Sequence, residues 1–127
     1  MRDHVNNLDA VASLVPAVHS ATLKGATVDL VGALGATLVV STGAIAGSGL
    51  YVMSVEESDT DVDGNFTTVA AADLLGDDLP ASLAASTVYR VGYIGTKRYL
   101  RAVITKTSGT SIAASAVFVT APSERPA

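Results

Sequence analysis

The segment 89–107, YRVGYIGTKRYLRAVITKT, constrains the fold more than any other part of this chain. In its first half, apolar or aromatic residues alternate with polar or small ones, and a Gly-Thr dipeptide separates it from a second half that is rich in apolar residues. The alternating positions hold Tyr89, Val91 and Tyr93 in the first half, and Tyr99, Arg101 and Val103 in the second. A period of two residues with a short connection predicts a β-hairpin, with strands over residues 86–94 and 97–107.

The same period continues through most of the chain, and turn-forming residues separate the runs. The expected strands cover residues 18–22, 27–31, 36–42, 50–58, 66–69, 86–94, 97–107 and 111–120. About eight strands spaced roughly ten residues apart predict a mainly β fold, an antiparallel β-sandwich or jelly roll. The strand over 36–42, ATLVVST, is mostly apolar, so we expect it to be covered on both faces. Residues 43–49 are expected to form a flexible loop, and 70–75 one helical turn.

The N-terminal segment has a different pattern. Val5, Leu8, Val11 and Val15 recur at helical spacing, and Pro16 ends the run. This pattern predicts either a short amphipathic helix or an extended arm that orders on a partner, because isolated helices of this length are marginal in water. The expected parts are an N-terminal arm or helix over 1–16, a β-sandwich domain over 17–121 and a C-terminal tail over 122–127.

The composition is that of one small domain with a thin core. The 127 residues are enough for a single β-sandwich. Hydrophobic residues make up 49% of the chain, but much of that is Ala and Val, and aromatic residues make up only 5%. Burial against partner subunits would therefore add to the stability of such a core.

Several classes of protein are disfavoured by composition. The net charge of −4 gives no general attraction to nucleic acid or to an anionic membrane. The absence of cysteine excludes disulfides and thiolate chemistry. The N-terminus lacks the cationic and apolar regions of a signal peptide, and five glycines interrupt the nearly uncharged stretch 31–55, so we expect neither secretion nor a membrane span.

Charge is unevenly distributed along the chain. Eight of the twelve acidic residues lie in 56–78, and five of the eight basic residues lie in 90–106. One interpretation is a contact between neighbouring subunits, with the acidic edge of one against the basic edge of the next. The other is an ordinary solvated surface, since charges also protect edge strands from aggregation.

The hairpin tip DTDVDG carries a possible calcium site. Asp59, Asp61 and Asp63 are carboxylates at alternating positions, and Gly64 permits a sharp turn. An EF-hand is excluded, because the twelfth position is Ala70 where a bidentate Glu is needed. The alternatives are a calcium-binding turn of another kind and a hairpin loop that uses Asp63-Gly64 as its turn.

No catalytic pattern is recognisable, so we expect the protein not to be an enzyme. His4 and His19 have no partner at metal-ligand spacing, and no nucleophile elbow or phosphate-binding glycine loop is present. The Tyr and Arg residues of 89–101 would suit a surface for nucleic acid or glycan. We expect the tyrosines to pack in a core instead, because tyrosines on a core face pack more often than they form stacking surfaces.

Three stretches of this chain resemble small proteins from the structural modules of tailed bacteriophages and prophages. The stretches are a helical-looking start over 5–18, an acidic hairpin with an Ala-rich turn over 56–75, and the Tyr-Arg-Val-Gly-Tyr and Lys-Arg-Tyr strands over 89–103. The hairpin tip is more acidic than is usual in that family.

The resemblance implies a virion protein that is made in the host cytoplasm and decorates the capsid surface. Its partners would be the major capsid protein and further copies of itself, plausibly as a homotrimer, without direct contact to nucleic acid or membrane and without a cofactor, calcium excepted. The expected contact residues are Val5, Leu8, Val11, Arg90, Lys97, Arg98 and Arg101. The alternatives are a head–tail connector or tail component, and a glycan- or host-surface-binding β-sandwich on the virion.

Overall fold

Ten β-strands and two short 3₁₀ helices form the part of the chain that the structure, a computed structural model, describes: residues 9–31, 33–76 and 82–122. The strands are β1 (Asp9–His19), β2 (Leu23–Lys24), β3 (Val28–Asp29), β4 (Ala33–Ala46), β5 (Leu50–Ser58), β6 (Thr67–Thr68), β7 (Leu74–Gly76), β8 (Val88–Tyr93), β9 (Tyr99–Ser108) and β10 (Ser111–Pro122). The helices are η1 (Asp63–Asn65) and η2 (Ala71–Asp73). Within these ranges no helix is long and apolar enough to cross a membrane.

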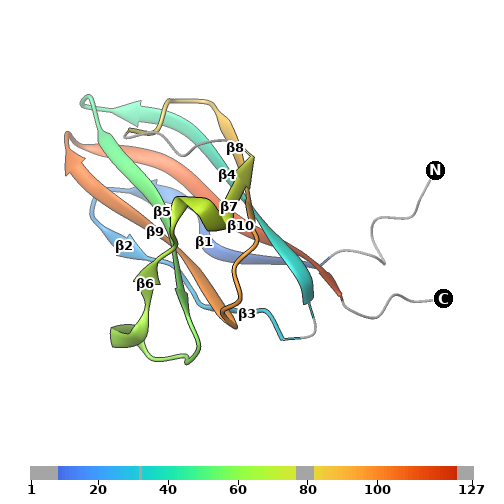
Figure 1. The fold of residues 1–127 in the computed structure, drawn as a ribbon. Coiled ribbons are helices and arrows are strands. Elements are labelled where there is room, and N and C mark those ends of the chain that lie inside the picture. The colour runs from blue at the N-terminus through green and yellow to red at the C-terminus, as the bar shows by residue number, and fades with distance from the viewer. Residues whose placement is uncertain (1–8, 32, 77–81, 123–127) are drawn as a thin grey trace, which may run out of the picture.

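The strands form two antiparallel sheets that face each other (Figure 1). Sheet A has the order β1-β10-β4-β8-β7, and sheet B has the order β2-β9-β5-β6, with β3 also paired to β9. If β2 with β3 and β6 with β7 are each counted as one interrupted strand, the ten strands become eight. Their orders are then 1-8-3-6-5 and 2-7-4-5, with strand 5 passing from sheet B (β6) to sheet A (β7), and the 1-8-3-6 and 2-7-4-5 sheets are those of a jelly roll. The mainly β sandwich expected from the alternating pattern is confirmed.

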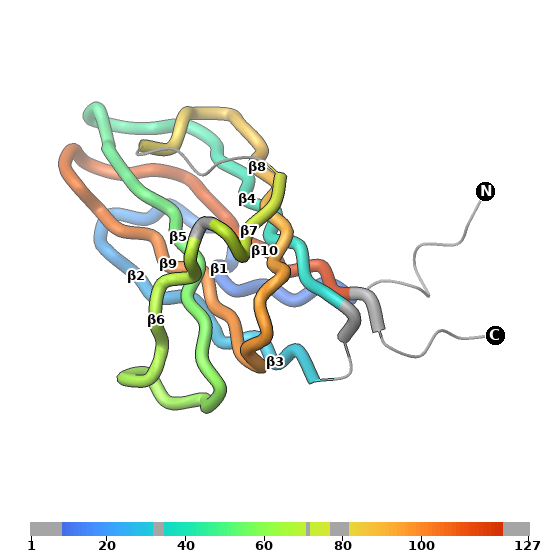
Figure 2. Tube along the Cα trace, viewed as in Figure 1, coloured from blue at the N-terminus to red at the C-terminus, as the bar shows by residue number. Residues whose placement is uncertain are grey.

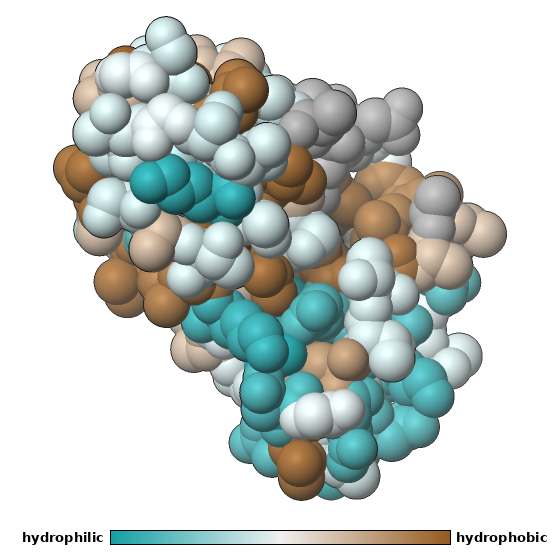
Figure 3. Space-filling view, turned by 90° about the vertical axis from the view of Figure 1, so that its left-hand side faces the viewer, coloured by the Kyte–Doolittle hydropathy of each residue, from teal (hydrophilic) through white to brown (hydrophobic). Residues whose placement is uncertain are grey.

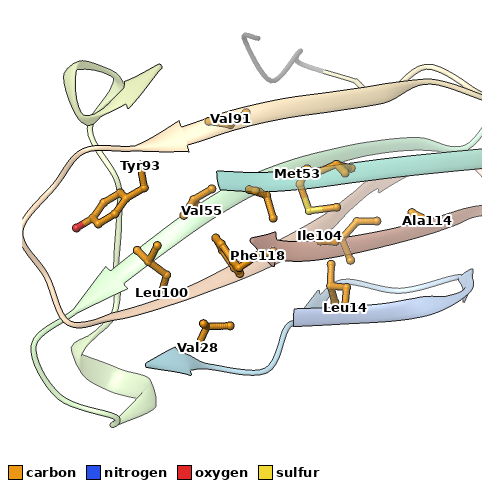
Figure 4. Packing of buried hydrophobic residues seen from close by; sticks show 14 of the residues in the cluster. Leu14, Val28, Met53, Val55, Val91, Tyr93, Leu100, Ile104, Ala114 and Phe118 are labelled. Carbon is orange, nitrogen blue, oxygen red and sulfur yellow. The ribbon is translucent and has the colours of Figure 1, made fainter. Parts of the chain in front are cut away.

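The core lies between the sheets and follows from that alternation. Inward positions of both sheets are apolar, and Figure 4 shows Leu14, Phe118 and Ala114 of sheet A pointing into the same layer as Met53 and Leu100 of sheet B. The largest fully buried side chains are Tyr51, Phe118, Leu14, Leu38, Met53, Leu100, Ile104, Ile112 and Val40. Burial of each of these apolar side chains stabilises the fold by about 1.5–3 kcal/mol.

The prediction of an N-terminal helix is wrong for the residues of this segment that the structure describes, 9–16. Residues 9–16 belong to β1, which pairs with β10 from Asp9 opposite Thr120 to His19 opposite Ile112. The strand has register shifts between Ala12 and Leu14 and between Leu14 and Ala17. Each shift inserts residues into one strand only, so side chains on one face recur at three or four residues instead of two. The valines of the helical pattern do not form the buried face: Val11 and Val15 are 44% and 65% exposed, and the buried residues of β1 are Ser13, Leu14 and His19.

β1 is an integral part of the sandwich and crosses the boundary expected at residue 16. Leu14 is buried in the core. The hydroxyl of Ser13 donates to the Ala26 carbonyl at 2.8 Å and accepts the Ala102 amide at 2.9 Å, which ties β1 to sheet B. Residues 1–8, with the expected contacts Val5 and Leu8, and residues 123–127 of the expected tail lie outside the described residues.

Smaller differences concern the ends of elements. The loop expected over 43–49 is shorter, because β4 continues to Ala46 and the turn is confined to Gly47-Ser48. Of the strand expected over 18–22 only the end of β1 is formed, and the strand expected over 27–31 is reduced to β3; β2 lies between the two. The tube in Figure 2 shows both described ends on the same side of the molecule, in keeping with the pairing of Asp9 with Thr120.

Candidate functional site

A cluster of ion pairs joins the β5–β6 loop to sheet B, and Arg101 is its centre. The Arg101 side chain is 7% exposed; its Nη2 lies 2.7 Å from Glu56 Oε1, and its Nη1 lies 2.6 Å from Asp63 Oδ1. The guanidinium also lies over the ring of Phe66, 4.1 Å from its centroid. We call Arg101, Glu56, Asp63 and Phe66 the Arg101 cluster. Asp63 accepts hydrogen bonds from Arg101 and from Lys24, and these bonds hold the pKa of Asp63 below its usual value.

Two further pairs link the segment 97–98 to acidic residues of the same chain. Arg98 holds Asp29 with two parallel bonds, Nε to Oδ1 at 2.9 Å and Nη2 to Oδ2 at 2.8 Å. The hydrogen bonds from Arg98, together with the one from the Val31 amide, lower the pKa of Asp29 to about 2. Lys97 Nζ lies 2.8 Å from Asp59 Oδ2. Figure 3 shows hydrophilic residues gathered over the lower part of the molecule, where the β5–β6 loop lies.

The acidic and basic stretches therefore meet within one chain. Lys97, Arg98 and Arg101 were expected as partner contacts, and each one holds an internal acidic partner. Arg101 is buried, whereas Lys97 and Arg98 keep part of their side chains at the surface. The two remaining described candidates, Val11 and Arg90, are exposed on sheet A.

Tyr93, at the end of β8, is buried and hydrogen-bonds to the β8–β9 connection. Its side chain is buried, and its hydroxyl donates to Glu57 Oε1 at 2.6 Å and accepts the Lys97 amide at 3.0 Å. Burial and the bond to Glu57 raise the pKa of Tyr93 to about 12. Tyr93 therefore packs in the core, as expected for tyrosines of this hairpin. A buried ring cannot serve as a platform for a sugar or a base, so the alternative of a glycan or nucleic-acid surface is not formed at Tyr93.

The carboxylates of the hairpin tip are not arranged around a common point. Asp59 faces Lys97, and Asp63 faces Arg101 and Lys24. Across the described residues, no group of three or more His, Cys, Asp or Glu side chains is placed to hold a metal ion. His19 is buried, with Nε2 at 3.1 Å from the Ala114 carbonyl, which accounts for it as a structural residue.

The outer face of sheet A is open, although the strand over 36–42 was expected to be covered on both faces: Thr37 and Val39 of β4 are only half-buried and Ser41 is exposed. The outward positions of its two central strands are half-buried or exposed and uncharged: Ala113, Ser115, Val117 and Val119 of β10, and Thr37, Val39 and Ser41 of β4. The pairing register places Ala12 beside Val117, and Val39 beside Arg90. The signal was present in β10, whose outward and inward residues are both mostly small or apolar.

A shallow groove indents this face beside β1. It has a volume of about 370 Å³ and is lined by Pro16, Ala17, Val18, Ser41, Thr42, Gly43, Ala113, Ala114 and Ser115. It lies where the register of β1 shifts between Leu14 and Ala17 and that of β10 shifts between Ile112 and Ala114. Two valines of β1 are exposed here: Val18, which lines the groove, is 69% exposed, and Val15, which precedes the lining residue Pro16, is 65% exposed.

Comparison with known proteins gives a likeness in fold. No protein-family model matches the chain, and no curated protein matches it. Among solved structures, the crystal structure of the SPBc2 prophage-derived protein YomS matches with a TM-score of 0.54 and 12% identity, over 88% of this chain and 94% of that one. At this identity, the likeness shows a shared fold.

Two structures of infectious bursal disease virus are more distant. The VP2 subviral particle matches with a TM-score of 0.48 and 10% identity, and the Gx strain with a TM-score of 0.44 and 17% identity. Each match covers 91% of this chain and 33% of the other. These scores are too low to support an argument about function.

Proposed function

We propose that this chain is a virion structural protein of a tailed phage or prophage, and that it decorates the head and stabilises its lattice. The observation that carries the proposal is the jelly roll, whose likeness to a prophage-derived protein extends over nearly the whole of both chains. Jelly rolls are a common fold of viral capsid proteins. The resemblance in the acidic hairpin and in segment 89–103 points the same way.

The mechanism is mass action. A protein that binds the assembled lattice and not its free subunits shifts the equilibrium toward the lattice, by an amount that grows with its concentration relative to its dissociation constant. The expected partner is the major capsid protein, together with further copies of this chain. The contacts are expected at Val11 and the other exposed valines of β1, at Arg90, and at Val5 and Leu8 of the N-terminal segment.

The test is binding to expanded heads that lack this protein. We expect a copy number close to that of the major capsid protein on a quantitative gel, and a higher temperature of head disruption. A variant lacking residues 1–8 keeps all of β1 and tests the arm alone; loss of binding by this folded variant is the expected result. Unchanged occupancy would exclude the arm as a contact.

The principal alternative is a head–tail connector or tail component. It predicts few copies per virion and a location at the neck or tail in a particle reconstruction. That outcome would contradict the decoration role while leaving a virion role in place. Hits on a glycan array, without binding to heads, would instead favour the host-surface-binding alternative.

A further inference from the structure

The outer face of sheet A is built like a strand layer that is covered on both sides. β4 and β10 are apolar or small at both inward and outward positions, a pattern typical of strands that are buried on both faces. None of the described elements packs on the outward side. On sheet B, by contrast, the Arg101 cluster and the β5–β6 loop cover part of the outer face.

The outer face of sheet A carries a protruding side chain, Val88, and the groove beside β1, and the two lie in the same row of paired residues. Val88 is opposite Ser41, and Ser41 is opposite Ser115, so these three residues form one row across β8, β4 and β10. Val88 is 60% exposed at the β8 margin of this row. The groove, which Ser41 and Ser115 help to line, lies at the β1 margin of the same row.

We propose that the outer face of sheet A packs against the same face of a second copy of this chain. With the two-fold axis parallel to the strands, β8 of one copy faces β1 of the other. The exposed Val88 of each copy then lies over the groove of its partner. Such a contact is isologous, with the same patch used on both sides.

Charge and area both fit this occupant. Arg90 is the one charged residue among the outward positions in the described register of β1, β10, β4 and β8, and the proposed axis keeps the two Arg90 side chains on opposite margins. Four strands about 4.8 Å apart and about ten residues long cover about 600 Å² in plane. With the relief of the side chains, this approaches the roughly 800 Å² per partner of a standard interface.

The test is the mass of the purified protein in solution, which does not depend on any virion. We expect sedimentation equilibrium at concentrations from about 10 to 500 μM to show reversible dimers. Val88→Lys places a charge over the groove and is expected to weaken the dimer at least about tenfold. Val62→Lys is the matched control, since Val62 is 55% exposed and lies at the tip of the β5–β6 loop; its dimerisation should be unchanged.

A second pair of variants probes the middle of the face. Val39→Lys on sheet A should abolish dimers, whereas Val52→Lys, at a half-buried outward position on sheet B, should retain them. Circular dichroism checks that each variant is folded. If Val39→Lys does not fold, the proposal is tested by Val88→Lys alone, because Val88 is exposed. A wild-type protein that is monomeric at 500 μM, or a Val88→Lys dimer as strong as that of the wild type, would overturn the proposal. Binding to heads is measured separately by occupancy, so failure of the dimer and failure of the decoration role can be told apart.

Discussion

At the scale of single residues, Arg101 is the side chain on which most local structure depends. It joins Glu56 of β5 to Asp63 of η1 and packs on Phe66. Replacement by Ala leaves Glu56 partly buried without its cation, and such losses cost about 3 kcal/mol. We expect Arg101→Ala to lower the free energy of unfolding by roughly that amount in urea titrations. Lys106→Ala, an exposed site on the same strand, is the control, and an equal effect of the two would contradict the central place of Arg101.

Tyr93 predicts a loss of stability at alkaline pH. Its pKa is raised from 10.0 to about 12 in the folded state, so the unfolded chain releases the phenolic proton first. The free energy of unfolding should therefore fall as pH rises from about 10 through about 12. Thermal unfolding across this range checks the slope. Tyr93→Phe cannot titrate and should show a flatter profile from a lower starting stability; an unchanged profile would mean that other groups cause the slope.

Asp29 and Asp63 predict the response to acid. Arg98 lowers the pKa of Asp29 from 3.8 to about 2, and Arg101 lowers that of Asp63. A lowered carboxyl pKa stabilises the folded state above the unfolded value and loses this effect as pH falls through the folded value. Stability should thus decline between about pH 4 and pH 2. Asp29→Asn should make the decline shallower in thermal melts, and a steeper decline would contradict the assignment.

At the scale of elements, β1 is the strand whose role differs most from expectation. Its Leu14 is buried in the core, and its Ser13 bonds to Ala26 and Ala102. Gly25 fits closely against β1, because a Cβ at that position would lie 2.7 Å from the Ser13 carbonyl oxygen. Removal of residues 1–16 should therefore unfold or strongly destabilise the domain, whereas removal of 1–8 should leave its melting temperature nearly unchanged. A folded protein without residues 1–16 would contradict the place of β1 in the core.

The alternating pattern predicted the regular strands and missed the irregular one. β5, β8, β9 and β10 lie where it placed them, because the register shifts insert no extra residue into β5, β8 or β10, and the one in β9 lies near its end. β1 contains two register shifts in its middle, and a pattern of fixed period cannot represent them. β2 and β3 are held by pairing with β9, a contact between distant parts of the chain that local patterns do not contain.

At the scale of the whole molecule, the sequence indicated that acidic and basic residues lie in different segments, but it did not indicate which acidic residue would pair with which basic one. The pairs Lys97–Asp59 and Arg98–Asp29 form because the jelly roll places β9 between β3 and β5. That strand order is a tertiary property, so the sequence suggested a contact between subunits or a solvated surface, and pairing within the chain was not foreseen. The same holds for the row of Val88, Ser41 and Ser115, which comes from three strands far apart in sequence.

This internal pairing predicts how binding responds to salt. Four basic side chains, Lys24, Lys97, Arg98 and Arg101, already hold acidic partners in the same chain, so few cations remain to attract a charged surface. Contacts through the valines of sheet A are apolar and are not screened. We expect the affinity for heads, and for a second copy, to change less than about threefold between 50 and 500 mM NaCl, measured by occupancy and by sedimentation. A tenfold or greater loss of affinity would show that ion pairs between molecules replace those within the chain. The contact would then involve the basic residues of segment 89–107.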